Sequence, residues 1–197
     1  MTISASDVQN LRQSTGVGMM EAKNALAACD GDFDKAIDHL RKSGSAKAAK
    51  RADRTTSEGL VHCYTHSNQK LGVVVELLCE TDFVAKNEIF TELAHNIAMH
   101  IAAMSPLYVS REEVPANVIA KEKEIYAEQL SQEGKPADMI EKISEGKLNK
   151  FYEEVCLLEQ PFIKDEDITI AELIESKIAS LGENIKLNRF TRIQIGG

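Results

Sequence analysis

The sequence predicts an α+β fold in which a small three-helix module precedes a three-stranded antiparallel sheet packed with helices. Three observations lead to this prediction. Apolar residues recur at helical spacing through the first 40 residues. Two strand-like segments, 60–66 and 71–79, are separated by turn residues and followed by long helical patterns. The chain then closes on a segment, 185–195, in which apolar and polar residues alternate.

The first 40 residues are expected to form three short helices. The first begins at Ser4, where Asp7 stands as the capping acid, and stops at the sequence TGVG of residues 15–18. The second covers about residues 19–29, and Asp32 caps the third. Three helices in about 40 residues fold only marginally alone. The module is similar to the ubiquitin-associated type.

The stretch RKSGSAKAAKRADR, residues 41–54, interrupts this pattern. Its Ser-Gly start predicts a hinge, and the Ala and Lys residues that follow predict a tethering helix. We therefore expect two domains: a three-helix module with its basic linker over residues 1–54, and a core domain over residues 55–197.

Charge is distributed unevenly along the chain. Six basic residues and one acid give residues 41–54 a charge of +5. The net charge of the whole chain is −8, so the remaining residues together carry a charge of −13. An acidic body repels nucleic acid, and the basic stretch has no aromatic residue that would stack on bases. A solvated linker or helix face is therefore favoured over a phosphate-binding segment, and no direct contact with nucleic acid is expected.

The N-terminus has no secretory or transit pattern, and no apolar stretch approaches the roughly 18 residues of a membrane span. We therefore expect a cytoplasmic protein that does not contact membranes. The four cysteines form no C-x-x-C pair, which indicates reduced thiols rather than disulfides or a zinc site.

The core domain is expected to open with a hairpin. Its second strand, 71–79, is almost continuously apolar, so it should be central in the sheet. A helix with a one-sided apolar stripe begins near Asn87 and closes at Ser105-Pro106.

Residues 107–160 are expected to contain three helices, which lie at about residues 118–130, 136–143 and 148–155. A break at 159–162 precedes a further helix, which begins with the capping box of Thr169 and Glu172 and stops near Gly182. The final strand, 185–195, is expected to pair with the hairpin.

Signatures of catalysis are missing from the sequence. There is no phosphate loop, no dinucleotide-binding glycine motif and no nucleophile elbow. His62 and His66 lie about 13 Å apart along one strand, too far to share a metal ion. His95 and His100 lie about 140° apart around a helix axis. We therefore expect no enzyme activity, no metal and no cofactor.

Two features suggest a contact surface instead. Met19 and Met20 are adjacent at a helix start and point about 100° apart, so one is expected to be exposed; an interface and a core role are about equally favoured. Asp82 and Phe83 directly follow the apolar strand. The pattern alone favours a buried Phe83, because it lies seven residues before Phe90.

Five segments carry a resemblance to a known family, and they read LRQSTGVGMMEAKNAL (11–26), TDFVAKN (81–87), HNIAMHIAA (95–103), LEQPF (158–162) and RFTRIQIG (189–196). In this order they strongly resemble the elongation factor Ts family, over essentially the whole chain. The chain looks like a short form with a single copy of the core. One departure is Glu21-Ala22, where the family commonly has Asp-Cys.

The resemblance implies a nucleotide exchange factor that binds elongation factor Tu carrying GDP. In such a factor Asp82 and Phe83, within the motif that also contains Thr81 and Val84, enter between helices of the GTPase domain and disturb its magnesium site.

The resemblance also carries contacts onto other parts of the chain. Arg12, Met19 and Met20 match the family's N-terminal contact with the GTPase domain, and the hairpin at 66–72 resembles a part that touches a distal domain. A homodimer would supply the second lobe.

Overall fold

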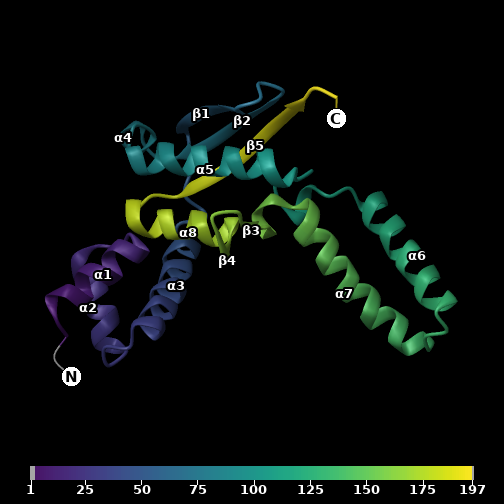
Figure 1. Cartoon of the computed structure of the whole chain (residues 1–197), viewed down its shortest axis with the longest axis horizontal. Coiled ribbons are helices and arrows are strands. Elements are labelled where there is room, and N and C mark those ends of the chain that lie inside the picture. Colours follow the sequence, from purple (N-terminus) through teal and green to yellow (C-terminus); the bar gives the residue numbers. More distant parts are fainter. Residues whose placement is uncertain (1–2, 197) are drawn as a thin grey trace. The chain divides into compact units, whose positions relative to one another are not determined.

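A computed structural model describes residues 3–196, which contain eight α-helices, two 3-10 segments and five strands (Figure 1). The elements are α1 (Ala5–Thr15), α2 (Met19–Ala28), α3 (Phe33–Ala49), β1 (Glu58–Thr65), β2 (Leu71–Cys79), α4 (Asp82–Ala85), α5 (Glu88–Met104), η1 (Arg111–Glu113), α6 (Ala116–Gln132), α7 (Ala137–Val155), η2 (Leu157–Glu159), β3 (Pro161–Phe162), β4 (Asp165–Thr169), α8 (Ile170–Leu181) and β5 (Ile185–Gln194). The main sheet is antiparallel in the order β1-β2-β5, which confirms the mixed α and β class, the three-stranded sheet and its central strand.

The chain divides into two compact units. The first comprises residues 1–62, 75–96 and 172–188, and the second comprises residues 63–74, 97–171 and 189–197. The strands of the main sheet and α5 continue from one unit into the other. The predicted boundary after residue 54 stays a prediction.

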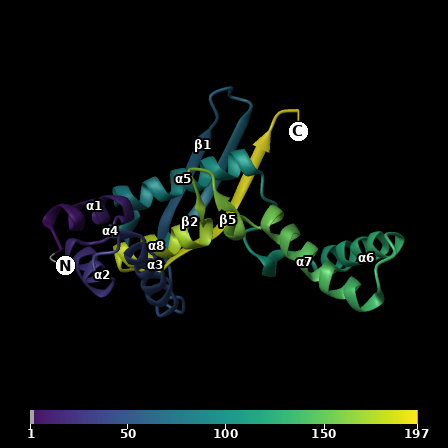
Figure 2. The same cartoon turned by 60° about the horizontal axis from the view of Figure 1, so that its bottom comes forward.

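The first unit contains the N-terminal helices α1 to α3, which lie together in Figure 2. Helix α1 begins with the predicted capping box: Asp7 N–H donates to Ser4 Oγ, and Ser4 N–H donates to the Asp7 carboxylate, both at 3.1 Å. Gly16 ends the helix at φ 71°, and the Asp32 carboxylate caps α3. The core of these helices is small and aliphatic, formed by Val8, Leu11, Ala22, Ala25, Leu26, Ala36 and Leu40.

The predicted hinge at Ser43-Gly44 is wrong, because α3 continues through it to Ala49. Gly44 is buried, and a Cβ atom there would lie 3.8 Å from the Cβ of Ala179 in α8. A glycine in a helix interior costs about 1 kcal/mol. The 3.8 Å separation is an ordinary contact distance, so an alanine would also fit at this position. The basic stretch is also partly paired within the protein, since Lys47 bonds to Glu21 of α2.

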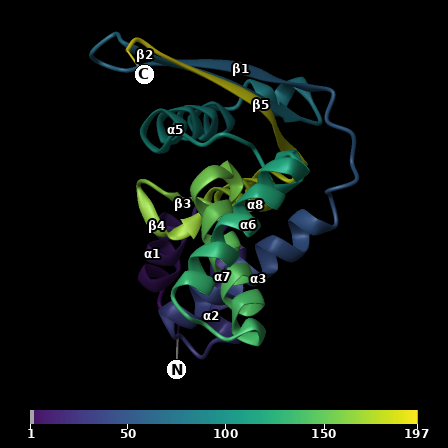
Figure 3. The ribbon, with the colours of Figure 1, turned by 90° about the vertical axis from the view of Figure 1, so that its right-hand side faces the viewer.

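Helix α5 runs along one face of the main sheet, as Figure 3 shows. The side chains between this helix and the sheet form a core. Alternate residues of β2 are buried, and so is the apolar stripe of α5: Val73, Val75, Leu77, Cys79, Phe90, Leu93, Ala94, Ile97, Ala98 and Ile101. Strand β1 approaches β2 so closely at Gly59 that a Cβ atom there would lie 2.2 Å from the carbonyl oxygen of Leu77. Only a residue without a Cβ fits this position.

The second unit contains α6 and α7, which run alongside each other as a helical hairpin (Figure 1). The two helices predicted between residues 136 and 155 are one continuous α7. Gly146 does not end it, because Ser144, Leu148 and Tyr152 keep a buried face at a spacing of four residues across the glycine.

The short hairpin of β3 and β4 was not predicted from the sequence. Beside it lies His100, which is fully buried. Its Nδ1 accepts a hydrogen bond from Ile163 N–H at 3.3 Å, so its Nε2–H donates to Gln160 Oε1 at 3.0 Å. Burial lowers the pKa of His100 below its ordinary value. This histidine is therefore a neutral structural group.

A search for membrane-spanning segments among the described residues finds no helix that combines the required length and apolar character.

Candidate functional site

Phe83 lies on the short helix α4, directly after the central strand, and its side chain is 83 % exposed. The alternative that Phe83 packs into the core is therefore wrong. Asp82 is also exposed, while Val84 is half-buried. Thr81 begins the helix, because its Oγ1 accepts a hydrogen bond from Val84 N–H at 3.4 Å. A large aromatic side chain is thus presented to solvent on a capped turn.

The carboxylate of Asp82 is held beside a cation of the same turn. Lys86 Nζ lies 2.7 Å from Asp82 Oδ2, four residues along the chain. The hydrogen bond and charge of Lys86 lower the pKa of Asp82 below its ordinary value, so the carboxylate is ionised at neutral pH. Both side chains are largely exposed, and the pair therefore contributes little to stability.

The turn is fixed by Glu183, from the connection between α8 and β5. Its Oε2 accepts hydrogen bonds from the backbone N–H groups of Glu80 at 3.2 Å and Thr81 at 3.0 Å. Its Oε1 accepts the Thr81 hydroxyl at 2.6 Å. Sequence reasoning missed Glu183, since an acid between Gly182 and a strand carries no local signal that it binds a turn 102 residues away.

A second set of bonds surrounds Glu80. Asn184 N–H donates to Glu80 Oε1 at 2.6 Å, and Arg54 Nη1 lies 3.4 Å from the same oxygen. The buried Asn184 side chain donates to the carbonyl oxygens of Ala52 at 3.2 Å and Arg54 at 2.9 Å. The segment after α3, the turn after β2 and the start of β5 are therefore joined by hydrogen bonds.

The N-terminal candidates lie around the connection from α1 to α2. Arg12 is exposed in the last turn of α1, and Met19 and Met20 begin α2 with exposed fractions of 49 % and 65 %. A core role for either methionine is therefore wrong. These three residues lie together at one end of the helical module. Thr81–Val84 form a second group, on the turn after β2. Both groups of candidate residues belong to the first unit.

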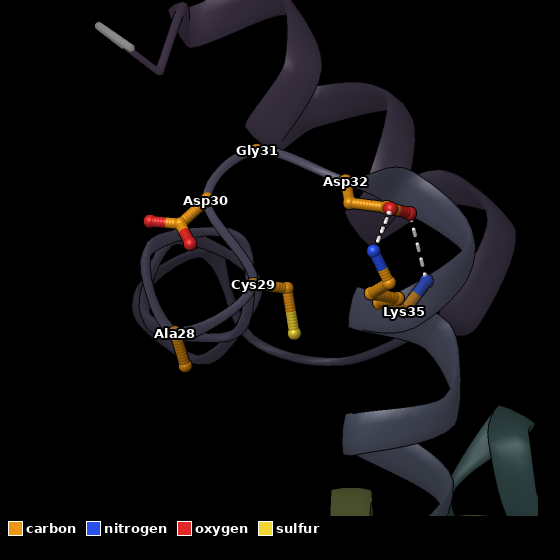
Figure 4. A pocket seen from close by; sticks show the side chains of 6 residues that line it. All are labelled: Ala28, Cys29, Asp30, Gly31, Asp32 and Lys35. Carbon is orange, nitrogen blue, oxygen red and sulfur yellow. Dashed lines mark hydrogen bonds and ion pairs between the residues drawn. The ribbon is translucent and has the colours of Figure 1, made fainter.

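A surface hollow beside the α2–α3 connection is lined by Ala28, Cys29, Asp30, Gly31, Asp32 and Lys35 (Figure 4). Its polar groups already have a structural role. Asp32 accepts the backbone N–H of Lys35 at 3.1 Å and pairs with its Nζ at 2.8 Å, and these contacts lower the pKa of Asp32. The hollow is the consequence of a helix cap.

Two histidine side chains, one from β1 and one from α5, lie within hydrogen-bonding distance of each other, which the sequence did not indicate. His62 Nε2 of β1 lies 3.2 Å from His95 Nδ1 of α5. Burial and the neighbouring His95 lower the pKa of His62. Within residues 3–196, no group of three or more His, Cys, Asp or Glu side chains is placed to hold a metal ion.

The family model for Elongation factor TS matches residues 33–197. Over 196 residues, all of both chains, the protein is 61 % identical to elongation factor Ts of Fervidobacterium nodosum. It is 57 % identical to elongation factor Ts of Moorella thermoacetica, over 98 % of this chain and 96 % of that one. It is 58 % identical to elongation factor Ts of Thermosipho melanesiensis, over 98 % of this chain and 99 % of that one. The chain belongs to the elongation factor Ts family.

Proposed function

We propose that this chain is a guanine nucleotide exchange factor of translation elongation, which binds elongation factor Tu carrying GDP and promotes release of the GDP. The observation that carries the proposal is the exposed Phe83 on a turn fixed by Glu183, in a chain of the elongation factor Ts family. The factor makes and breaks no covalent bond and uses no cofactor. Its place of action is the cytoplasm, and it contacts neither membrane nor nucleic acid directly.

In the proposed mechanism, Asp82 and Phe83 enter between two helices of the partner's GTPase domain. GDP is held through Mg²⁺ and its phosphates, so a displacement of the groups around the cation lowers the affinity for GDP. Phe83 supplies a stiff apolar wedge of the kind that dominates protein interfaces. The ionised Asp82 accepts a hydrogen bond or repels a nearby carboxylate, and Thr81 and Val84 flank the pair.

Arg12, Met19 and Met20 form a separate contact with the same partner. Methionine side chains are flexible and polarisable, which suits an exposed contact that adapts to its partner. We also propose that residues 1–54 act as a ubiquitin-associated-like module that presents this contact, and that residues 55–197 form the core domain. The compact aliphatic core of α1 to α3 supports a separate module.

The proposed functional form is a homodimer. Strands of the main sheet carry exposed apolar side chains, namely Val61, Val74 and Ile193. Such side chains on a sheet favour contact with a second copy. Light scattering at micromolar concentration is expected to give twice the chain mass of 21.7 kDa; the mass of a single chain would contradict the dimer.

The proposal is tested by nucleotide release. Elongation factor Tu is loaded with fluorescent GDP and mixed with excess unlabelled GDP, with and without a substoichiometric amount of this chain. We expect the fluorescent GDP to dissociate much faster in the presence of the chain, with each molecule acting on many partners. An unchanged release rate would refute the proposed function.

A further inference from the structure

We propose that Glu183 and Asn184 are positioning residues, which hold the turn of Phe83 in its exposed form before a partner binds. The inference rests on the proposed function, since it gives these residues a part in nucleotide exchange. Both residues lie in the connection from α8 to β5, distant in sequence from the turn that they contact.

Glu183 acts on the backbone of the turn rather than on its exposed side chains. One carboxylate oxygen accepts the successive N–H groups of Glu80 and Thr81, and the other accepts the Thr81 hydroxyl. Two neighbouring N–H groups directed at one oxygen form an anion-binding concavity. Here a side chain of the protein itself fills it.

The turn needs this external support because α4 has only four residues, Asp82–Ala85. Its own backbone bonds include those from Ala85 N–H to Thr81 O and from Lys86 N–H to Asp82 O, both 3.2 Å, and from Asn87 N–H to Val84 O at 3.0 Å. A helix this short is not stable by itself. The carboxylate of Glu183 therefore supplies order that the local sequence does not.

Asn184 connects the same turn to the segment that follows α3. Its N–H donates to Glu80, and its side chain donates to the carbonyl oxygens of Ala52 and Arg54. Asn184 is 6 % exposed, so these bonds are largely shielded from water. Glu183 and Asn184 thus both bond to the turn after β2, and Asn184 also bonds to the segment that follows α3.

This arrangement lowers the cost of inserting Phe83 into a partner. A wedge on a disordered turn must be ordered at the moment of insertion, and that cost is subtracted from the binding free energy. With Glu183 in place, the ordering has already occurred on folding. Its removal is therefore expected to slow the step at which GDP leaves, and to leave the initial contact through the N-terminal helices unchanged.

The test compares Glu183→Ala and Glu183→Gln with wild type in the fluorescent-GDP assay, as a function of factor concentration. We expect Glu183→Ala to lower the maximal release rate about tenfold, with an unchanged half-saturating concentration. A glutamine amide can still accept both N–H groups and donate to Thr81 Oγ1, so Glu183→Gln should restore most of the rate. A loss of folded protein would raise the half-saturating concentration and leave the maximal rate unchanged.

Hydrogen exchange of the free protein provides the second readout. The amides of Glu80 and Thr81 are expected to exchange faster in Glu183→Ala, while most others are unchanged. Glu175→Ala is the matched control, because this acid of α8 bonds to Ser45 and not to the turn; it should behave as wild type. A wild-type maximal rate or unchanged protection in Glu183→Ala would overturn the inference. If wild type itself fails to release GDP, the proposed function fails, and the protection of the two amides still decides whether Glu183 fixes the turn.

Discussion

Replacement of Phe83 by alanine separates a role in the core from a role in binding. The side chain is 83 % exposed, so the folded chain gains little from it. We expect the melting temperature to change by no more than about 1–2 °C, the shift that corresponds to about 0.5 kcal/mol in a chain of this length. A phenylalanine removed from a core would instead cost about 3–5 kcal/mol.

The effect on exchange follows from the same exposed fraction. Full burial of a phenylalanine side chain is worth about 1.5–3 kcal/mol. Because 83 % of the side chain is still exposed in the free protein, insertion into a partner gains about 1.2–2.5 kcal/mol. We therefore expect Phe83→Ala to lower the efficiency of GDP release about 8- to 70-fold.

The assay is the release of fluorescent GDP from elongation factor Tu, measured over a range of factor concentrations beside thermal melts of the same preparations. Leu107→Ala serves as the control, since Leu107 is 67 % exposed and belongs to the second unit, whereas Phe83 belongs to the first. It should retain wild-type efficiency. The reasoning would be refuted if Phe83→Ala kept full efficiency, or if its melting temperature fell by many degrees.

Three further predictions concern contact, acidity and packing. Met20→Ala should raise the half-saturating factor concentration in the release assay and leave the maximal rate unchanged, because Met20 is exposed on the N-terminal helices, which we propose make the initial contact with the partner; a lower maximal rate alone would contradict this. The lowered pKa of His100 means that, below pH about 6.5, the unfolded chain takes up a proton that the folded chain does not. Stability is therefore retained above that pH and lost at up to about 1.4 kcal/mol per pH unit below it. Urea unfolding at pH 7.5 and 5.5 should show this loss in wild type and a smaller one in His100→Gln; equal losses would exclude His100 as the cause. Gly59→Ala should be strongly destabilised, because its Cβ would lie 2.2 Å from the Leu77 oxygen; a wild-type melting temperature would show that β1 shifts freely.

The parts of the fold that were predicted correctly depend on neighbours in sequence. Ser4 and Asp7 cap one helix within three residues, and Asp32 caps another in the same way. The predicted central place of β2 is also correct, since β1 and β5 pair with its two edges, although only alternate residues of its apolar run are fully buried. For the two caps the competing interactions are local, so the residue pattern contains the information.

The errors occurred where tertiary packing outweighs local preference. Gly44 was read as a hinge, yet contact with Ala179 makes a small residue suitable inside α3. Separate helices were expected at about residues 136–143 and 148–155, yet the buried face of α7 continues across Gly146. Neither contact can be inferred from the residues that flank the glycine.

The candidate site shows the same division. Periodicity favoured a buried Phe83, and only the resemblance to a family pointed to the exposed Phe83 that the structure contains. The support from Glu183 and the contact of His62 with His95 join residues 102 and 33 positions apart. Such contacts are set by topology, and a single sequence does not display them.

The central claim is that this chain and GDP oppose each other on elongation factor Tu. The most direct test is the dissociation constant of the chain for elongation factor Tu, measured without nucleotide and with saturating GDP and Mg²⁺. Linkage requires GDP to weaken the binding of the factor by the same ratio as the factor weakens the binding of GDP. We expect binding about 5- to 150-fold weaker with GDP, the usual range of such coupling. Equal dissociation constants in the two conditions would contradict the claim.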